Sequence, residues 1–376
     1  MTMYQKKSIL AGCAVAALAL SLGAAAPVAA QNFGSGERAS PERPVTRVGT
    51  RGAAFLDIPV GARANGLAGA GSVVTEGIDA LYWNPAAAGS VTGLTAGLSY
   101  SEVFSGTGIE HYYTGILLPL AGFTFGVTVN SLTSGEIPRT QETTPSGENA
   151  ALGSTYDFTA TAIGVHVGRQ ITDRLVVGAA VKHISEGIQG ARASWVGADV
   201  GIRFETGLYG TRIGASILNV GGAARMSGQL VTANIGVARE VFAVERNIPV
   251  NLNTQLAQLP TAFQFGVAMD LAGAPQSLLG TDPRHKATLM FDLRDGTNTA
   301  MQPLIAAEYG FNDFAFIRVG KRWENEELAN YETSHGLSAG LGLRLNALGR
   351  RFDIDYGYMN LGILNERHVF SFQFSM

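Results

Sequence analysis

The sequence closes with Arg367-His368-Val369-Phe370-Ser371-Phe372-Gln373-Phe374-Ser375-Met376, in which large apolar side chains recur at every second position. Successive side chains of an extended strand point to opposite faces, so this pattern predicts one apolar and one more polar face. His368, Phe370, Phe372, Phe374 and Met376 share the first face, and Arg367, Val369, Ser371, Gln373 and Ser375 share the second. A membrane β-barrel needs such strands, because its outside meets lipid and its inside lines the lumen. We therefore expect this stretch to be the strand that closes a barrel.

The first thirty residues predict a secretory signal peptide. Lys6 and Lys7 supply positive charge, an apolar run follows over residues 9–22, and Val28-Ala29-Ala30 supplies small residues for cleavage. The only cysteine of the sequence, Cys13, lies inside this segment. A processed chain would therefore have no thiol for a disulfide or for catalysis.

The composition of the chain is typical of a membrane barrel. Residues 31–376 contain no apolar run near the length of about 20 residues that a transmembrane helix requires. Charged residues make up 15% of the sequence and hydrophobic residues 46%, whereas soluble domains carry about 25% charged residues. Without Lys6 and Lys7, 25 basic residues remain against 30 acidic ones, which is a net charge of −5. This balance argues against a nucleic-acid partner, and the expected contact is with outer-membrane lipid.

Alternation of the same kind predicts an all-β fold, a 14-stranded antiparallel transmembrane β-barrel over residues 91–376. The expected strands start near residues 93, 107, 122, 154, 173, 193, 210, 261, 286, 302, 314, 335, 350 and 367. Tight connections such as Pro119–Gly122 alternate with longer ones such as Gly135–Gly153 and Val220–Pro260. A soluble sandwich would also alternate, but short turns on one side and long loops on the other indicate an outer-membrane barrel. Residues 229–242 could form a further strand; we assign them to a long loop, because an added strand would make the count odd.

The segment before the barrel divides into two parts. Residues 31–60 are polar, contain three prolines and predict an extended or partly disordered lead-in. Residues 61–90 are rich in small side chains and predict short helices that pack in a confined space. The step Asn84-Pro85 should end one of these helices, because a residue before proline disfavours the α conformation. A phosphate-binding glycine loop is a poorer interpretation, since no buried strand precedes the glycines and no Lys-Ser or Lys-Thr pair follows them.

This segment resembles the N-terminal signature of PorV/PorQ-type outer-membrane proteins, which belong to the wider group of FadL-like barrels. The matching positions include Gly61, Ala62, Arg63, Asp79, Trp83, Asn84 and Pro85, with further matches at Val181–Ile184, Gly197–Gly201 and Gly214–Gly221. The resemblance implies a fourteen-stranded barrel with an N-terminal helical hatch segment, residues 61–90, in the lumen. Two positions depart from the family pattern: Ala87-Ala88 replaces Gly-Leu, and Met376 replaces an aromatic residue.

Several charged residues fall on the predicted inner face of the strands. These candidate lumen charges are Arg174, Lys182, Asp199, Arg203, Asp270, Arg318, Arg344, Asp353 and Asp355. Charges inside a barrel are unfavourable unless they pair or stay hydrated. They could form a structural network that braces barrel and hatch, or a polar gate that admits a ligand. The sequence favours the network, because a polar lumen is the default for this architecture.

The sequence predicts no enzyme activity, no cofactor and no metal site. The histidines at 111, 166, 183, 285, 335 and 368 lack metal-ligand spacing, and no Gly-x-Ser-x-Gly elbow is present. Aromatic residues are expected at the membrane interfaces or the rim, namely Tyr112, Tyr113, Trp195, Trp323, Tyr331, Tyr356 and Tyr358.

Two functions remain for an integral protein of the bacterial outer membrane. The resemblance implies an accessory or shuttle component of type IX secretion-like export, with secretion-system components and cargo proteins as partners. The alternative is a FadL-like channel for passive transport of hydrophobic small molecules, by an opening in the wall. On the sequence, the resemblance places export first.

Overall fold

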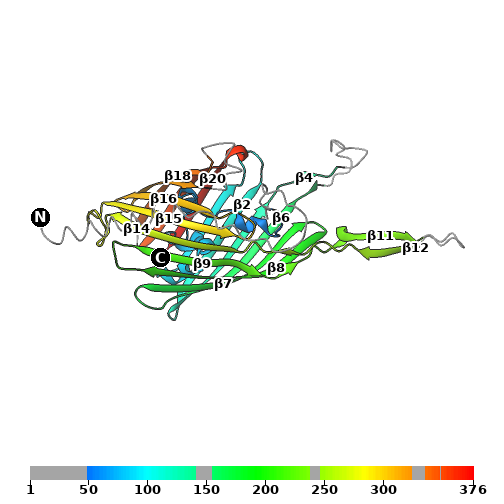
Figure 1. Ribbon diagram of the computed structural model, residues 1–376, viewed down its shortest axis with the longest axis horizontal. Helices are drawn as coiled ribbons and strands as arrows, with labels where there is room; N and C mark the ends of the chain where they lie inside the picture. The colour runs from blue at the N-terminus through cyan, green and yellow to red at the C-terminus, as the bar shows by residue number, and fades with distance from the viewer. Residues whose placement is uncertain (1–48, 141–154, 238–245, 324–334, 348) are drawn as a thin grey trace, which may run out of the picture. The chain divides into compact units, whose positions relative to one another are not determined.

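The computed structural model describes residues 49–140, 155–237, 246–323, 335–347 and 349–376. Fourteen strands in this described part form one closed barrel, and each strand pairs antiparallel with its neighbours (Figure 1). The barrel strands are β1 (Thr95–Glu102), β2 (Glu110–Leu120), β3 (Phe123–Thr133), β6 (Phe158–Gln170), β7 (Leu175–Ile188), β8 (Ala191–Glu205), β9 (Arg212–Gly221), β14 (Ala262–Ala272), β15 (His285–Gly296), β16 (Gln302–Phe311), β17 (Ala315–Arg322), β18 (Leu337–Ala347), β19 (Arg350–Asn360) and β20 (Glu366–Ser375). The predicted fold class and strand number are confirmed.

The final strand closes the ring, as its alternation predicts. β20 pairs with β1 from Thr95 opposite Ser375 to Glu102 opposite His368, and with β19 on its other side. Val369 and Ser371 are buried inside, whereas Phe370 and Phe372 are exposed outside. Every backbone group of the closing ladder therefore has a neighbour on each side, and the barrel has no free edge.

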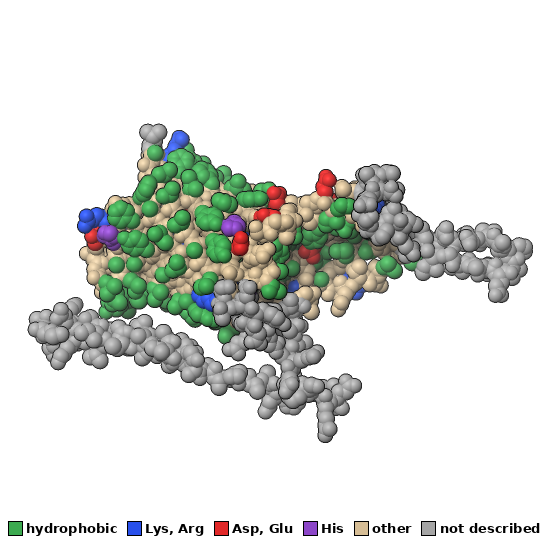
Figure 2. Space-filling view, turned by 90° about the horizontal axis from the view of Figure 1, so that it is seen from above, with side chains coloured by type: hydrophobic (Ala, Val, Ile, Leu, Met, Phe, Trp, Pro, Cys, Tyr) green, Lys and Arg blue, Asp and Glu red, His purple; other side chains and the backbone are tan. Residues whose placement is uncertain are grey.

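Large apolar side chains cover the outside of the wall. Examples on different strands are Leu98, Ile116, Phe125, Val165, Val196, Ile317, Leu341 and Phe370, all exposed. On the face drawn in Figure 2, hydrophobic side chains dominate the strand region and few charged ones interrupt it. No helix among the described residues is long and apolar enough to cross a membrane. An outward apolar band of this kind is stable against lipid, so we treat the strands as membrane-spanning segments.

The connections define two ends of the barrel. At the turn end they are mostly short, such as Ala121–Gly122, where both residues have positive φ (53° and 79°). At the loop end they are mostly longer, and residues 222–261 between β9 and β14 are the longest described case. One difference from the predicted pattern is the two-residue hairpin Gln189–Gly190 at the loop end. β7 and β8 are the longest strands of the barrel, so their own extension takes the place of a loop there.

The long loop contains strands that stay outside the barrel. β11 (Thr232–Val237) pairs with β12 (Arg246–Asn251), and β10 (Ala223–Ala224) pairs with β13 (Ala257–Gln258). Figure 1 shows β11 and β12 as a ribbon of their own. The described part of residues 229–242 therefore adds no strand to the barrel, as predicted, and residues 238–242 lie outside the described residues. A further small sheet joins β4 (Ile137–Pro138) and β5 (Thr155–Tyr156).

Short helices fill the lumen ahead of the first strand. They are η2 (Ala54–Asp57), α2 (Ala62–Gly66), α3 (Gly77–Trp83) and η3 (Pro85–Ser90), and together with their connections we call residues 53–90 the hatch. α2 packs on β17 to β20, α3 on β1 and β2, and η3 on β3 and β6 to β8. Hatch packing starts before Gly61, because Ala53, Phe55 and Leu56 are apolar and buried. The predicted signal peptide and residues 31–48 of the lead-in lie outside the described residues.

Glycines in the strands let the hatch approach the wall closely. A Cβ at Gly178 of β7 would collide with the backbone of Pro85, and one at Gly357 of β19 with the carbonyl of Ala62. The same holds at Gly320, where a Cβ would meet the backbone of the Leu67–Ala68 step. Glycine is thus required here by close backbone approach, which the high glycine content of the sequence reflects.

Candidate functional site

At the loop end the lumen is closed by apolar packing, which we call the loop-end seal. Phe55 and Leu56 of η2 pack in a cluster of buried side chains that come from the wall at the loop end. The wall members are Val103, Leu132, Ala160, Ala162, Ile184, Ala193, Trp195 and Leu259. These positions face inward, where a barrel that passes polar solutes would carry polar side chains.

Two aromatic residues that the sequence places at the membrane interface lie inside the barrel. Trp195 is 4% exposed, and its Nε1 donates to the carbonyl of Ala257 at 2.9 Å. Tyr113 is also buried and packs edge-on against Tyr82 of the hatch. That prediction is wrong for both, because strand alternation puts each on the inner face. Tyr112 is exposed outside, as predicted, and Tyr331 lies outside the described residues.

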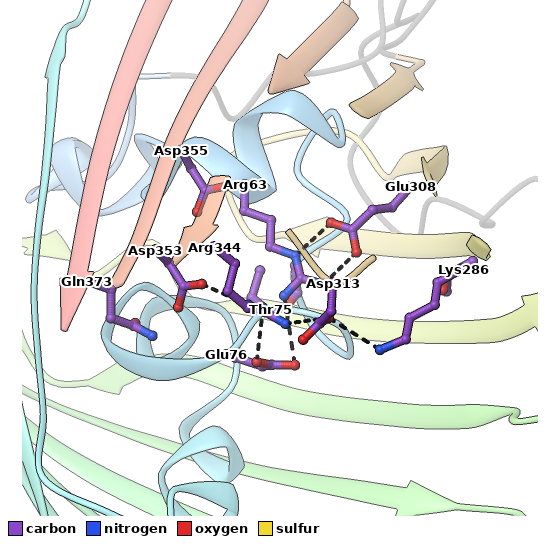
Figure 3. A network of polar contacts seen from close by, with 12 residues as sticks. Arg63, Thr75, Glu76, Lys286, Glu308, Asp313, Arg344, Asp353, Asp355 and Gln373 are labelled. Carbon is purple, nitrogen blue, oxygen red and sulfur yellow. Dashed lines mark hydrogen bonds and ion pairs between the residues drawn. The ribbon is translucent and has the colours of Figure 1, made fainter. Parts of the chain in front are cut away.

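At the turn end the hatch is held by ion pairs, which we call the turn-end network (Figure 3). Arg63 of α2 binds both carboxylate oxygens of Glu308 on β16, at 2.9 and 2.7 Å. Glu308 also accepts from Arg318 Nε at 2.6 Å, and Arg318 Nη1 donates to Asp355 at 2.5 Å. Arg318 is 3% exposed and Glu308 9%, so the centre of this chain of four charges is buried and must remain paired.

Glu76, just before α3, extends the network on the hatch side. Its carboxylate lies 2.8 Å from Arg351, 3.8 Å from Arg344 and 4.0 Å from Arg63. Burial by itself would raise the pKa of Glu76, but these three guanidinium groups outweigh it and hold the pKa at about 2. Asp353 joins Arg344 and Arg351 from the wall, at 2.8 and 2.7 Å.

A second hatch carboxyl group, Asp79, has no cationic partner among the described residues. Its Oδ2 accepts from the hydroxyl of Ser371 on β20 at 2.8 Å, and the same hydroxyl accepts from the amide of Ala62 at 2.8 Å. Burial raises the pKa of Asp79 to about 7, the Ser371 hydrogen bond opposes the shift, and nearby Asp355 adds to it. Asp79 is therefore the group of the hatch whose charge changes near neutral pH.

The turn end is hollow as well as charged. One cavity of about 800 Å³ is lined by Glu76, Arg203, Arg351 and Gln373, and another of about 740 Å³ by Arg63, Glu76, Asp270 and Lys286. We call this space the vestibule. The polar lining of the vestibule contrasts with the apolar cluster at the loop end, so the two sides of the hatch differ in chemistry.

The signature residues of the hatch position its helices. Trp83 Nε1 donates to the carbonyl of Val60 at 2.9 Å. Asn84 Oδ1 accepts from the amide of Ala86 at 3.0 Å, and its Nδ2 donates to the carbonyls of Ser72 and Ile202. The sequence step Asn84-Pro85 ends α3, and the Asn84 side chain then caps η3. Gly61 precedes α2 with φ of 86°, a left-handed value that favours glycine.

The other candidate lumen charges fall into separate places. Lys182 and Asp199 pair at 2.7 Å, and Asp199 also accepts from the amide of Asn219, where β8 and β9 shift register. Arg203 donates to the hatch carbonyls of Ser72 and Thr75. Asp270 pairs with Arg212 at 2.5 Å, next to the vestibule. Arg174 is exposed in a turn, so it lines the vestibule mouth and lies apart from the network.

The sequence reasoning missed several members of the turn-end network. Glu308 and Arg351 lie on the inner face of their strands, so the alternation that selected Asp353 and Asp355 could also have selected them. Glu76 gives no such signal, because it lies in an irregular connection. Among the described residues, no group of three or more His, Cys, Asp or Glu side chains is placed to hold a metal ion.

No family model matches the chain, and neither does any curated protein. Solved structures do match. The "CymD monoaromatic hydrocarbon channel" is 12% identical, over 85% of this chain and 97% of that one, with a TM-score of 0.50. The toluene transporter TbuX of Ralstonia pickettii is 14% identical over 84% and 97% (TM-score 0.49), and a Pseudomonas aeruginosa FadL homologue is 11% identical over 85% and 98% (TM-score 0.47). At these identities the likeness concerns the fold alone, and it spans nearly the whole length of the hydrocarbon channel.

Proposed function

We propose that this chain is a non-catalytic channel of the bacterial outer membrane through which small hydrophobic molecules pass. The observation that carries the proposal is the apolar inner lining at the loop end, which the hatch occupies with Phe55 and Leu56. The hydrophobic interaction between this lining and the hatch side chains is non-directional and depends on the apolar area removed from water. An apolar solute can therefore replace the hatch side chains there, whereas a sugar or an ion cannot.

The route would lead from the loop-end seal toward the vestibule. Between them stands the hatch, clamped to the wall by Arg63 and by Asn84. We propose that the hatch signature forms this clamp together with Arg203 and the lumen charges of the turn-end network, whereas Arg174 lies apart from it. The hydrocarbon channel that shares the fold is compatible with an apolar cargo.

The export role implied by the PorV/PorQ resemblance stays a prediction. Its partners, secretion-system components and cargo proteins, would need a binding surface, and no contact of the described residues identifies one. The apolar lining at the loop end favours the channel, so we place it before export. For either function we propose Sec-dependent export, with removal of residues 1–30 and insertion into the outer membrane.

The test is uptake by cells that lack a hydrophobe channel of their own and express this chain. We expect faster entry of a radiolabelled single-ring hydrocarbon than in cells with the empty vector, and unchanged entry of a sugar. Ile184→Asp places a charge in the apolar lining and should remove the faster entry of the hydrocarbon. Val181→Asp would not serve as a control, because Val181 lies on the outer face of the same strand, where a charge would face lipid. Val103→Thr, in the same seal, changes polarity but not charge and should lower entry less than Ile184→Asp. Equal rates with and without the chain, or a parallel rise for the sugar, would contradict the proposal.

A further inference from the structure

A cavity of about 170 Å³ lies in the seam between the hatch and the wall. Pro59, Ala68 and Trp83 line it from the hatch, and Gln264, Arg294 and Leu304 line it from strands β14 to β16. It is separate from the vestibule, with which it shares no lining residue. A cavity of roughly 150 Å³ is known to hold one benzene molecule, so this space matches a compound of about one ring.

Gln264 is the unusual residue of this cavity wall. It is 3% exposed, yet among the described residues neither its Nε2 nor its Oε1 has a hydrogen-bond partner. Buried amides are normally paired, because leaving one unpaired loses the hydrogen bonds it made with water. A side-chain amide presents an NH2 donor group and a carbonyl acceptor next to each other. Its complement is a group that presents an acceptor and a donor in the same way.

The charges around the cavity indicate a neutral ligand. The charged lining residues are Asp57, Asp292, Arg294 and Arg322, whose formal charges cancel. Arg294 and Asp57 pair with each other at 2.8 Å, and Asp292 accepts from the Ser72 hydroxyl at 2.7 Å. An ionised ligand would add an uncompensated charge to a buried site, which is unfavourable.

We propose that this cavity binds a neutral molecule of about one ring that carries an amide or lactam edge, and that Gln264 recognises this edge. The proposal rests on the proposed function, because such a ligand reaches the seam through the lumen. It deepens that function by adding a polar recognition element to a route that is otherwise apolar. The ligand would touch Trp83 of the hatch and Gln264 of the wall together.

The experiment measures equilibrium binding to the purified full-length barrel in detergent, by isothermal titration. Benzamide is the probe, ethylbenzene is the apolar compound of similar size, and benzoate is the ionised one. We expect benzamide to bind at least tenfold more tightly than either. Gln264→Leu keeps the volume but removes donor and acceptor, and should weaken benzamide binding tenfold or more. Gln170→Leu, an exposed position of β6, should leave it unchanged.

Several outcomes would overturn this site. They are no benzamide binding at millimolar concentration, equal binding of ethylbenzene or benzoate, and unchanged affinity in the Gln264→Leu barrel. The comparison of the three compounds uses the unaltered protein, so it decides the matter even if the variant does not fold. Hydrocarbon uptake by cells expressing the unaltered chain separates the two proposals. Uptake together with no benzamide binding would remove only the seam site, whereas benzamide binding without uptake would remove only the channel.

Discussion

At the loop end of the lumen, Phe55 and Leu56 of the hatch pack on aliphatic side chains, whereas at the turn end Arg63 and Glu76 form ion pairs with the wall. The first contact depends on area and tolerates exchange with another apolar group. The second depends on geometry, and the loss of one partner leaves a buried charge unpaired. We propose that the loop-end seal selects the molecules that enter, and that the turn-end network fixes the position of the hatch. The following changes alter one end and leave the other.

The largest effect is expected from Glu308→Ala. This change leaves Arg63 and Arg318 buried without their shared carboxylate, and breaking such a pair destabilises by roughly 3–5 kcal/mol. Hydrogen exchange of residues 61–90 should rise strongly, while residues 53–56 at the loop end stay protected. Glu366→Ala, at an exposed site, serves as the control. Equal protection of both segments in the variant would show that the two ends are not separate.

Phe55→Ala tests the opposite end. Truncation of a buried phenylalanine should destabilise the hatch by about 3 kcal/mol and open a cavity in the loop-end seal. Entry of the hydrocarbon into cells should increase, and exchange at Glu76 and Asp79 should change little. Phe370→Ala removes a ring from the outer face and controls for lost aromatic area. A fall in hydrocarbon entry would argue that Phe55 belongs to the route itself.

Asn84→Ala affects the seam between the two ends. The change removes the cap of η3 and the two donors that bind Ser72 and Ile202, and should destabilise the hatch by about 2 kcal/mol. Chemical denaturation of the purified barrel, followed by exchange at residues 84–90, measures the effect. Asn253→Ala, in the exposed loop, should have none. An unaltered exchange rate in Asn84→Ala would show that Asn84 does not hold the hatch to the wall.

The smallest effect is a pH dependence that depends on Asp79. Its pKa of about 7 in the folded chain exceeds the ordinary value of 3.8, so the folded form retains a proton that the unfolded form releases. Stability from this group is full below about pH 4, falls as the pH rises through 7, and is constant above about pH 8. Between pH 6 and 8 the loss is about 1 kcal/mol.

Hatch exchange at the two pH values measures this dependence. The exchange rate should increase from pH 6 to pH 8 in the unaltered protein and increase less in Asp79→Asn, which keeps the hydrogen bond to Ser371. Glu76, with its pKa at about 2, does not titrate in this window and adds no slope. A slope in the variant equal to that of the unaltered protein would assign the effect to another group.

Sequence periodicity predicted the barrel in considerable detail. The strands predicted near residues 302, 350 and 367 begin at Gln302, Arg350 and Glu366. The positions of the short turns predicted at which end of the barrel each connection lies. Strands and turns can be predicted from the sequence because alternation and turn chemistry are local properties of the chain. The same alternation, followed consistently, also places Glu308 and Trp195 inside.

The sequence by itself thus determined the strands, the closure of the ring and the presence of small residues in a confined hatch. Only the tertiary structure decided that Glu76 pairs with Arg351, 275 positions away, or that Phe55 belongs to an apolar seal and Gln264 to a buried cavity. The reason is that partners across a lumen depend on the stagger of every strand around the ring and on the path of the hatch through it. No local pattern in the chain contains that information.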